Sequence, residues 1–229
     1  TALFLVRHLI FDLDRTGSRF DHLLGKEIGR LGIAEAGVDV GDDRHDVRFM
    51  IVDRGLNLLR LELVAFGARG VEILERPTGP GAAWQVRVGM GASRTAFEAR
   101  TVEIAELRLD ATDVDMGNPH AVAFLPADMD LDGLDLSRRP ALDPEPVDGA
   151  NIELVSERGP HHVAMRVHER GVGETQSCGT GACAAAAATR FWAGASAPDE
   201  YLVQVPGGIV SATFVPGPDG AEHVVLAGP

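Results

Sequence analysis

The sequence predicts an α+β protein of two lobes. From Leu61 onward, short apolar stretches separated by Gly, Pro and Asp are typical of β-strands joined by turns. One alanine-rich stretch, Gly181–Trp192, predicts a long helix among these strands, because alanine has the highest helix propensity. Glycine-rich residues at Gly89–Ser93 mark the expected boundary between the lobes.

Expected helices and strands are interspersed along the chain. In the first 60 residues we expect strands at Leu3–Leu13 and Val47–Val52 and a helix at Asp21–Leu31. A shorter helix is expected over Asp128–Arg139, in a stretch bounded by prolines. The later strands are expected at Val71–Leu74, Trp84–Val88, Thr101–Leu109, Ala121–Leu125, Ile152–Val155, His162–His168, Tyr201–Val205 and Ile209–Phe214.

Composition narrows the class of protein. The 229 residues are enough for one large or two small domains, and 45% apolar with 24% charged residues is ordinary for a globular protein. The net charge of −13 would repel phosphate backbones, so no nucleic-acid partner is expected. The chain begins at Thr1 without a methionine, as a processed or partial chain does, and the apolar run Thr1–Phe11 is too short to be a signal peptide or a membrane span. We therefore expect no membrane partner.

Both cysteines lie close together in the sequence. Two cysteines, Cys178 and Cys183, do not make a disulfide framework, so a reduced, cytoplasmic setting is expected. Cys178 stands where a glycine-rich turn becomes the alanine-rich helix. A helix N-terminus lowers the pKa of a thiol and binds carboxylates. The pattern favours proton transfer at an amino-acid α-carbon by Cys178, whereas Cys183, among alanines, is expected to be a packed core thiol.

Other segments carry polar residues that composition alone does not explain. Asn118 and His120 stand in a turn before an expected strand, Asn151 ends another turn, and Glu169 and Arg170 follow a strand. Each has an ordinary structural interpretation: turn capping for the asparagines, a loop histidine, a solvated charge pair. The combination is more specific than any one of its parts.

Three segments together resemble the diaminopimelate epimerase family. They are Met116–Ala121 (MGNPHA), Asp148–Glu153 (DGANIE) and His168–Ala184 (HERGVGETQSCGTGACA), in matching order and approximate spacing. Val86–Gly91 and Val205–Gly208 are similar to further segments of the family. The resemblance covers roughly Leu61 to the C-terminus.

The resemblance implies a fold of two similar α+β lobes, each a strand-rich sheet wrapped around a central helix, with the active site in the cleft between them. On that basis the first lobe would be residues 1–91, the second residues 92–218 with the Cys178 half-site, and residues 219–229 a strand returning to the first lobe. The implied activity is epimerisation of LL- to meso-diaminopimelate for lysine and peptidoglycan synthesis, without a cofactor or metal. The implied substrate is a small amino acid, and the assembly to consider is a homodimer.

Residue by residue, the resemblance implies a catalytic group of Cys178, Glu169 and His120. Gly179 and Thr180 would offer backbone N–H groups to the α-carboxylate. Arg170, Asn118 and Asn151 would hold the distal end of the substrate, which agrees with the preference of arginine for carboxylates.

The family's first-lobe motifs, Asn-Ala-Asp-Gly-Ser and Cys-Gly-Asn-Gly, do not occur, and no cysteine precedes Cys178. Inversion by two bases needs groups on opposite faces of the α-carbon, and Cys183 shares a helix start with Cys178. Two alternatives to a working epimerase therefore stay open: a catalytically dead relative that binds diaminopimelate, and an epimerase of another amino acid.

Two rival motifs are weaker. Leu9–Thr16 resembles the Asp-x-Asp-x-Thr strand end of haloacid-dehalogenase-type phosphotransferases, but too few residues separate it from the acidic stretch near Asp42. Gly179–Ala184 fits a loose dinucleotide-binding pattern without a clear strand ahead of it. Neither displaces the cysteine hypothesis.

Overall fold

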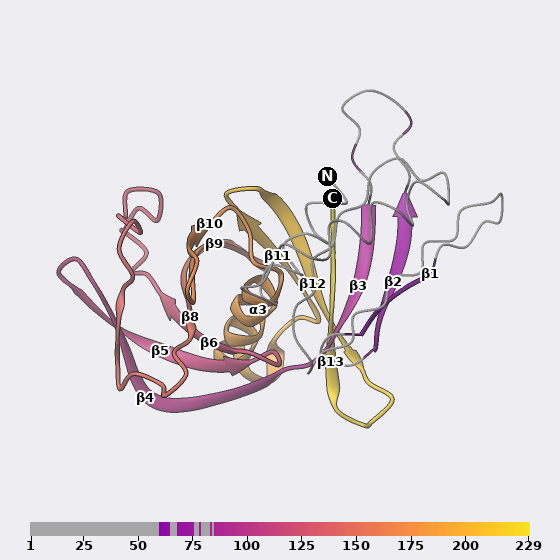
Figure 1. Cartoon of the computed structure of the whole chain (residues 1–229), viewed down its shortest axis with the longest axis horizontal. Coiled ribbons are helices and arrows are strands. Elements are labelled where there is room, and N and C mark those ends of the chain that lie inside the picture. The colour runs from indigo at the N-terminus through magenta and orange to yellow at the C-terminus, as the bar shows by residue number, and fades with distance from the viewer. Residues whose placement is uncertain (1–59, 65–67, 76–77, 79–82, 84) are drawn as a thin grey trace, which may run out of the picture. The chain divides into compact units, whose positions relative to one another are not determined.

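The computed structural model describes residues 60–64, 68–75, 78, 83 and 85–229 (Figure 1). The chain divides into two compact units: unit 1 is Thr1–Gly89 with Ala227–Pro229, and unit 2 is Met90–Leu226. The lobe limits expected from the sequence stay predictions. The elements expected at Leu3–Leu13, Asp21–Leu31 and Val47–Val52 lie outside the described residues.

The described part of unit 1 is an antiparallel meander. It is formed by β1 (Arg60–Val64), β2 (Ala68–Glu75) and β3 (Gln85–Ala92). Along β3, buried Val86 and Val88 alternate with exposed Arg87, which is the two-residue period of a half-buried strand. An exposed ion pair joins Arg87 to Glu72 across the β2–β3 ladder, 3.0 Å between nitrogen and oxygen.

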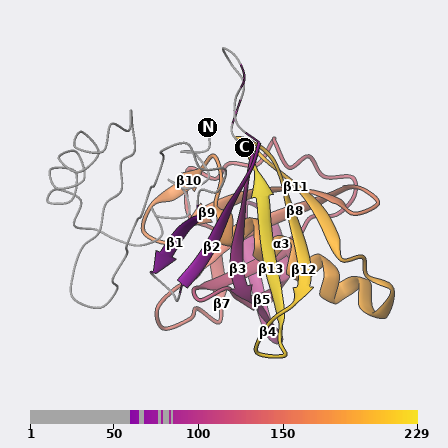
Figure 2. The ribbon, with the colours of Figure 1, turned by 90° about the vertical axis from the view of Figure 1, so that its right-hand side faces the viewer.

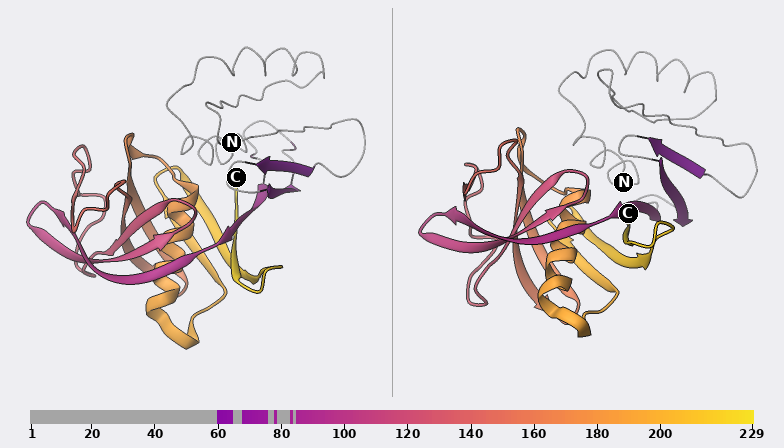
Figure 3. Two further views of the ribbon diagram at one scale, coloured as in Figure 1. Left: turned by 60° about the horizontal axis from the view of Figure 1, so that its bottom comes forward. Right: turned by 90° about the horizontal axis from the view of Figure 1, so that it is seen from below.

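Unit 2 is built on a mixed sheet that wraps around one helix (Figures 1 and 3). Its strands run in the order β13-β12-β11-β9-β8-β6-β5-β4-β7, with β10 beside β9; the pairs β6–β8 and β9–β11 are parallel. The strands are β4 (Arg94–Ile104), β5 (Leu107–Asp115), β6 (Pro119–Phe124), β7 (Ala141–Asp143), β8 (Asn151–Gly159), β9 (His162–Glu169), β10 (Gly173–Thr175), β11 (Glu200–Val205), β12 (Gly208–Pro216) and β13 (Glu222–Gly228). Figure 2 shows β11, β12 and β13 edge to edge. The α+β class expected from the sequence is confirmed for the described residues.

Helix α3 (Gly179–Ala193) is the centre of unit 2, and it covers the expected helix Gly181–Trp192. It contacts β4, β5, β6, β8, β9, β11 and β12, and its alanines from Ala182 to Ala188 are buried. Small side chains let the curved sheet approach the helix closely on several sides. The helix ends at Ala193, and the next residue, Gly194, has a positive φ of 70°, which glycine adopts more readily than other residues; its N–H donates to the Arg190 carbonyl. The 3-10 turn η1 (Gly194–Ser196) follows. None of the helices in the described part of the chain is long and apolar enough to span a bilayer.

The strands β6 and β8, in the middle of the unit 2 sheet, are covered on both faces. Side chains on one face of β6 and β8, such as Ala121, Ala123, Ile152 and Leu154, pack with Leu131, Leu136 and Leu142 in an apolar cluster. Side chains alternate along a strand, so the residues between them, among them His120 and Glu153, face α3 instead. The face toward the helix therefore carries the polar residues of the candidate site.

The helix expected over Asp128–Arg139 is wrong: this stretch is a series of turns and bends. Asp130 and Asp135 accept the backbone N–H groups of Asp132 and Ser137, which gives the backbone partners outside a helix. Hydrogen bonds from Ser137 also hold the pKa of the Asp135 carboxyl below its usual value. Arg166 of β9 donates to the carbonyls of Leu131, Asp132 and Leu134, so a side chain of another element holds this segment.

The single strand expected over Thr101–Leu109 is also wrong. β4 and β5 form a hairpin in which Ile104 pairs with Leu107, and the chain turns at Ala105–Glu106. Ala105 has a φ of 52°, a conformation that short hairpin turns require and that Asn or Gly adopts more readily. Without one of those residues, the turn has no sequence signature.

Candidate active site

The polar residues of the candidate site come from three elements that meet at the start of α3. His120 lies on β6, and Asn151 and Glu153 lie on β8, which runs parallel to β6 with His120 opposite Asn151. Glu169 ends β9, which is antiparallel to β8. All four side chains are buried, with at most 3% of their surface exposed. A sheet interior rarely holds such residues unless they have partners or a function.

Cys178 is the N-cap of α3. Its backbone is extended, with φ −126° and ψ 119°, and its carbonyl accepts the first helical hydrogen bond from Ala182 N at 2.9 Å. Its sulfur accepts from the backbone N–H of Gly181 at 3.2 Å and lies 3.4 Å from the Thr180 hydroxyl. The thiol, 1% exposed, thus occupies the position where Ser or Asp usually caps a helix, and the helix dipole favours negative charge there.

A chain of hydrogen bonds runs from Cys178 into the sheet. The amide nitrogen of Asn118 donates to Thr180 Oγ1 at 3.3 Å, and the amide oxygen of Asn118 lies 3.1 Å from His120 Nε2. On the other side of its ring, His120 Nδ1 lies 2.7 Å from Glu153 Oε1. We call Cys178, Thr180, Asn118, His120 and Glu153 the Cys–Glu chain. It connects the helix N-terminus with two neighbouring strands.

Glu169 is held by the turn that leads to Cys178. Its Oε1 accepts a hydrogen bond from the Thr175 hydroxyl, which also lies 3.5 Å from the Ser177 carbonyl. Thr175 belongs to β10, the short strand that pairs with β9. The β9–β10 hairpin therefore positions the carboxylate of Glu169 relative to the turn that carries the thiol.

Asn151 and Arg170 form a separate group. Asn151 Oδ1 accepts the backbone N–H of Arg170 at 2.8 Å, and the Arg170 guanidinium donates to the Asp148 carbonyl at 2.7 Å. Gly149 lies under this side chain at φ 68°, and an added Cβ there would lie 3.3 Å from Arg170 Cδ. The guanidinium is thus supported by the loop before β8.

The structure places the residues expected from the sequence in these groups. Cys178, Thr180, Asn118 and His120 belong to the Cys–Glu chain. Glu169 contacts Thr175 in the turn that leads to Cys178. Asn151 and Arg170 form the group supported by the loop before β8. Gly179 and Thr180 are the first residues of α3, where N–H groups point out of the helix end. Their roles toward a substrate stay predictions. Cys183 is fully buried within α3.

Glu153 is a site residue that the sequence reasoning missed. It lies inside the segment DGANIE, where an acidic residue between Ile152 and Leu154 in an expected strand was a usable signal: a charge on the buried face of a strand needs a partner. Among the described residues, no group of three His, Cys, Asp or Glu side chains is arranged to hold a metal ion.

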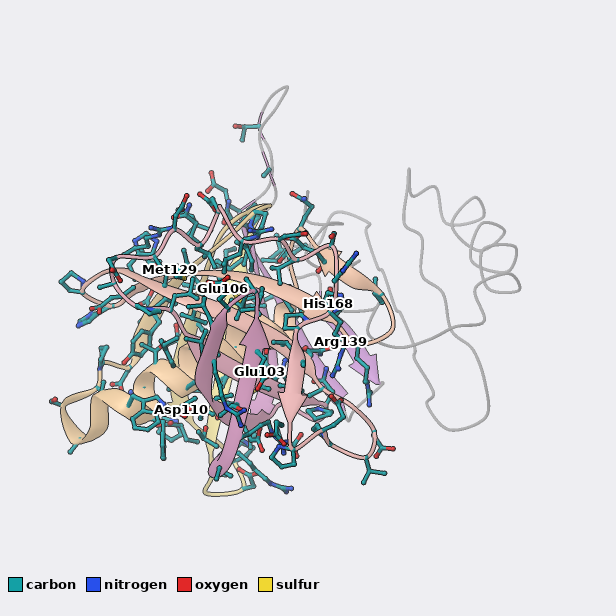
Figure 4. The ribbon with its side chains drawn as sticks, turned by 90° about the vertical axis from the view of Figure 1, so that its left-hand side faces the viewer. Glu103, Glu106, Asp110, Met129, Arg139 and His168 are labelled. Atoms are coloured by element: carbon teal, nitrogen blue, oxygen red, sulfur yellow. The ribbon has the colours of Figure 1, made fainter. Side chains whose placement is uncertain are left out.

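His168 lies beside the site but faces the other side of β9. Burial lowers the pKa of this imidazole, and the positive charge of Arg139 lowers it further; Figure 4 shows the two side chains next to each other. The folded chain therefore binds a proton at His168 less readily than the unfolded chain does. At this group, proton uptake by the unfolded chain lowers the free energy of unfolding as the pH falls below about 6.5, the unfolded value, and has no effect at higher pH.

We expect His168→Gln to reduce the fall in the free energy of unfolding between pH 7.5 and pH 5.5. The reason is that glutamine has no proton to take up on unfolding. Urea unfolding followed by circular dichroism at several pH values measures this. The exposed His161 of the β8–β9 hairpin provides the matched control, since His161→Asn should keep the wild-type dependence. Equal pH dependence in wild type and His168→Gln would contradict the expectation.

Comparison with known proteins agrees with these features. The sequence profile described as diaminopimelate epimerase matches residues 112–227, half of the chain. The diaminopimelate epimerase of Streptomyces coelicolor is 48% identical over 151 residues, 63% of this chain and 50% of that protein. The diaminopimelate epimerase of Acidothermus cellulolyticus is 37% identical over 183 residues, 78% of this chain and 55% of that protein. The chain spans about half the length of the curated relatives it matches.

Solved structures support the fold. A probable proline racemase from Agrobacterium radiobacter with bound carbonate aligns with a TM-score of 0.52 at 14% identity, over 77% of this chain and 58% of that one. A hydroxyproline epimerase from Agrobacterium vitis with bound trans-4-hydroxy-L-proline aligns with a TM-score of 0.50 at 15% identity, over the same shares. At this identity the likeness concerns the fold alone. With the sequence profile covering α3, the Cys178 turn and the strands around them, the chain belongs to the diaminopimelate epimerase family.

Proposed function

We propose that this chain transfers the α-proton of diaminopimelate in the cofactor-independent epimerisation of the LL to the meso form, with Cys178 as the proton-transfer group on one face. The observation that carries the proposal is the thiol at the N-cap of α3, where the Gly181 N–H donates to its sulfur. Such an environment favours the thiolate, which is the basic form of a cysteine. The family relationship supports the choice of substrate.

In the proposed proton transfer, both the α-proton and the C–H electron pair have a place to go. The Cys178 thiolate takes the α-proton and becomes a thiol, while the C–H electron pair moves into the α-carboxylate as an enolate. The N–H groups of Gly179 and Thr180 would stabilise that charge, because oriented donors act most strongly where charge develops. Return of a proton to the opposite face inverts the centre, and return from Cys178 exchanges the proton with retention.

We assign the remaining contacts by chemistry. Glu169 would bind the α-ammonium group, and His120 would act next to the thiol through the Cys–Glu chain. Arg170, with Asn118 and Asn151, would hold the distal end of the substrate. An arginine there favours a substrate with a distal carboxylate over amino acids without one.

A second candidate function rests on the number and position of the cysteines in the sequence. The only cysteines of the 229 residues are Cys178 and Cys183, both at the start of α3. A second thiol for the opposite face is therefore not provided by this sequence. This favours, as the alternative, a protein that binds diaminopimelate without turning it over; an epimerase of another amino acid is the third possibility.

One experiment separates these functions. The protein is incubated with LL-diaminopimelate in D₂O, and deuterium at the α-carbon and formation of the meso product are followed together. We expect α-exchange, and exchange with inversion would show a complete epimerase. Exchange without inversion would show Cys178 working alone on one face. Binding without exchange would support the alternative, a protein that binds diaminopimelate without turning it over. A folded protein that shows neither binding nor exchange would refute the proposed substrate.

We also infer a cytoplasmic location and a homodimer as the assembly to test. The location is supported by the cysteine content of the sequence, since two cysteines in 229 residues do not make a disulfide framework. Sedimentation of the purified chain would test the assembly.

A further inference from the structure

Glu153 is the most deeply buried acidic residue of the described chain that the proposed reaction does not use. Its side chain has no exposed surface, and it lies on β8 beneath the start of α3. One oxygen, Oε1, contacts His120 Nδ1 at 2.7 Å, and the other, Oε2, has no hydrogen-bond partner. A buried carboxyl group with an unpaired oxygen costs free energy, so its place here calls for a reason.

The reason lies in how protons are distributed along the Cys–Glu chain. With the amide N–H of Asn118 donated to Thr180, the amide oxygen faces His120, and in this arrangement His120 Nε2 carries a proton and donates it. The short contact between His120 Nδ1 and Glu153 Oε1 holds one further proton. Whichever of the two atoms carries that proton, the His120–Glu153 pair is electrically neutral, and Nε2 stays a donor.

The donor-to-acceptor order of these hydrogen bonds continues from Asn118 through Thr180 to the sulfur of Cys178. Because Thr180 Oγ1 accepts from Asn118, the hydroxyl has its own proton left to donate, and Cys178 Sγ lies 3.4 Å away. Together with the Gly181 N–H, the sulfur then receives two donors, which stabilise a thiolate more than a thiol because hydrogen bonds to a charged acceptor are stronger. If His120 Nε2 were an acceptor instead, the Asn118 amide would have to turn over and Thr180 would donate away from the sulfur.

We propose that Glu153 is a positioning residue for Cys178: it keeps His120 protonated at Nε2 and thereby directs the Thr180 hydroxyl proton to the Cys178 thiolate. Glu153 touches neither the sulfur nor the substrate in this scheme and acts through three intervening side chains. The inference rests on the proposed function, in that the thiolate of Cys178 is the reactive form. Its test uses the free protein without substrate, so it can fail or succeed independently of the proposed substrate.

The test measures how the rate of alkylation of Cys178 by iodoacetamide depends on pH. A Cys183→Ala background leaves Cys178 as the only thiol of the chain. In this background Glu153→Met, which cannot hydrogen-bond to His120, should move the midpoint of the rate profile to higher pH by about one unit. Glu153→Gln should move it by less than half of that, because the glutamine amide can donate to Nδ1 and keep Nε2 protonated. Glu157→Gln, an exposed glutamate on the same strand, is the matched control and should leave the midpoint unchanged.

A double-variant cycle tests whether Glu153 acts through Thr180. Thr180→Val removes the hydroxyl and should raise the midpoint by itself, and adding Glu153→Met to Thr180→Val should raise it no further. Additive shifts, no shift in Glu153→Met, or a shift to lower pH would overturn the proposal; the last outcome would mean that Glu153 acts mainly by repelling the thiolate.

A second measurement does not depend on whether Glu153→Met folds. In ¹⁵N-labelled wild-type protein, the ring nitrogens of His120, assigned by their loss in His120→Gln, should show a protonated Nε2 at the pH where Cys178 is alkylated rapidly. An unprotonated Nε2 under those conditions would overturn the proposed direction of the chain.

Discussion

Cys178→Ala is expected to lower the rate of α-proton exchange of diaminopimelate by about 10³-fold or more, to the background rate. A positioned general base contributes about 10²- to 10⁴-fold, and in the proposed reaction the base also has to be generated as a thiolate at the N-cap of α3. Alanine keeps the backbone of the turn but removes the sulfur, the atom that we propose receives the proton. Deuterium incorporation measured by proton NMR, with the wild type at equal concentration, gives the ratio directly.

Cys183→Ala is the matched control for that loss. Cys183 lies five residues further along, fully buried among the alanines of α3. Its replacement removes one sulfur from a packed interior, so we expect a fall of about 1 kcal/mol in the free energy of unfolding and exchange close to the wild-type rate. Equal loss of exchange in both folded variants would contradict the division of roles between the two cysteines.

The elements that the sequence predicted well are those with a local cause. The helix follows from a run of alanines after Gly181, and most strands follow from alternation such as Val86, Arg87 and Val88. Cys178 could be placed at the helix start for the same reason, since a glycine-rich turn before an alanine run is visible in the sequence itself. These are features that a few neighbouring residues decide.

The elements that were wrongly predicted from the sequence depend on residues that are distant along the chain. The stretch Asp128–Arg139 was expected to be a helix, but Arg166 on β9 and the carboxylates of Asp130 and Asp135 take up its backbone groups. The turn at Ala105 forms because β4 and β5 pair on both sides of it, not because alanine favours that conformation. Neither partner is indicated by the local pattern.

The candidate site shows the same division. Each residue of the Cys–Glu chain except Glu153 was expected, because the resemblance assigned it a role, but their grouping was not. Asn118 was expected with Arg170 at the distal end of the substrate, whereas the structure joins Asn118 to His120 and Thr180. The Cys–Glu chain exists because β6 and β8 pair in parallel, with His120 opposite Asn151, a register that requires the folded sheet.

The position of the thiol also limits what the chain does alone. Cys178 and Cys183 follow each other on one helix, and Cys183 is sealed inside unit 2, so the two thiols do not flank a common carbon. Inversion requires a proton donor on the opposite face of the α-carbon. The ratio of exchange to inversion in D₂O is therefore more informative about this chain than turnover alone.

Gly181→Ala is expected to reduce α-proton exchange by about 100-fold while lowering the free energy of unfolding by only about 1 kcal/mol. An added Cβ would lie 2.8 Å from Glu153 Oε1, 3.1 Å from Cys178 Cβ and 3.2 Å from Cys178 Sγ. Overpacking costs about 1–3 kcal/mol, and the higher helix propensity of alanine offsets about 1 kcal/mol of this. The methyl group would displace both ends of the Cys–Glu chain, and a displacement of about 1 Å at a reacting group can cost about 100-fold in rate.

Two further variants separate displacement of the site from loss of stability. Ala184→Gly, in the buried middle of the same helix, should lower the free energy of unfolding by about 1 kcal/mol or more and keep the exchange rate, because it leaves the start of the helix unchanged. In a Glu153→Ala background the carboxylate oxygen nearest the new methyl group is gone, so Gly181→Ala should cost less stability there than in the wild type. An equal cost in both backgrounds would mean that the contact between residues 181 and 153 does not require the glycine.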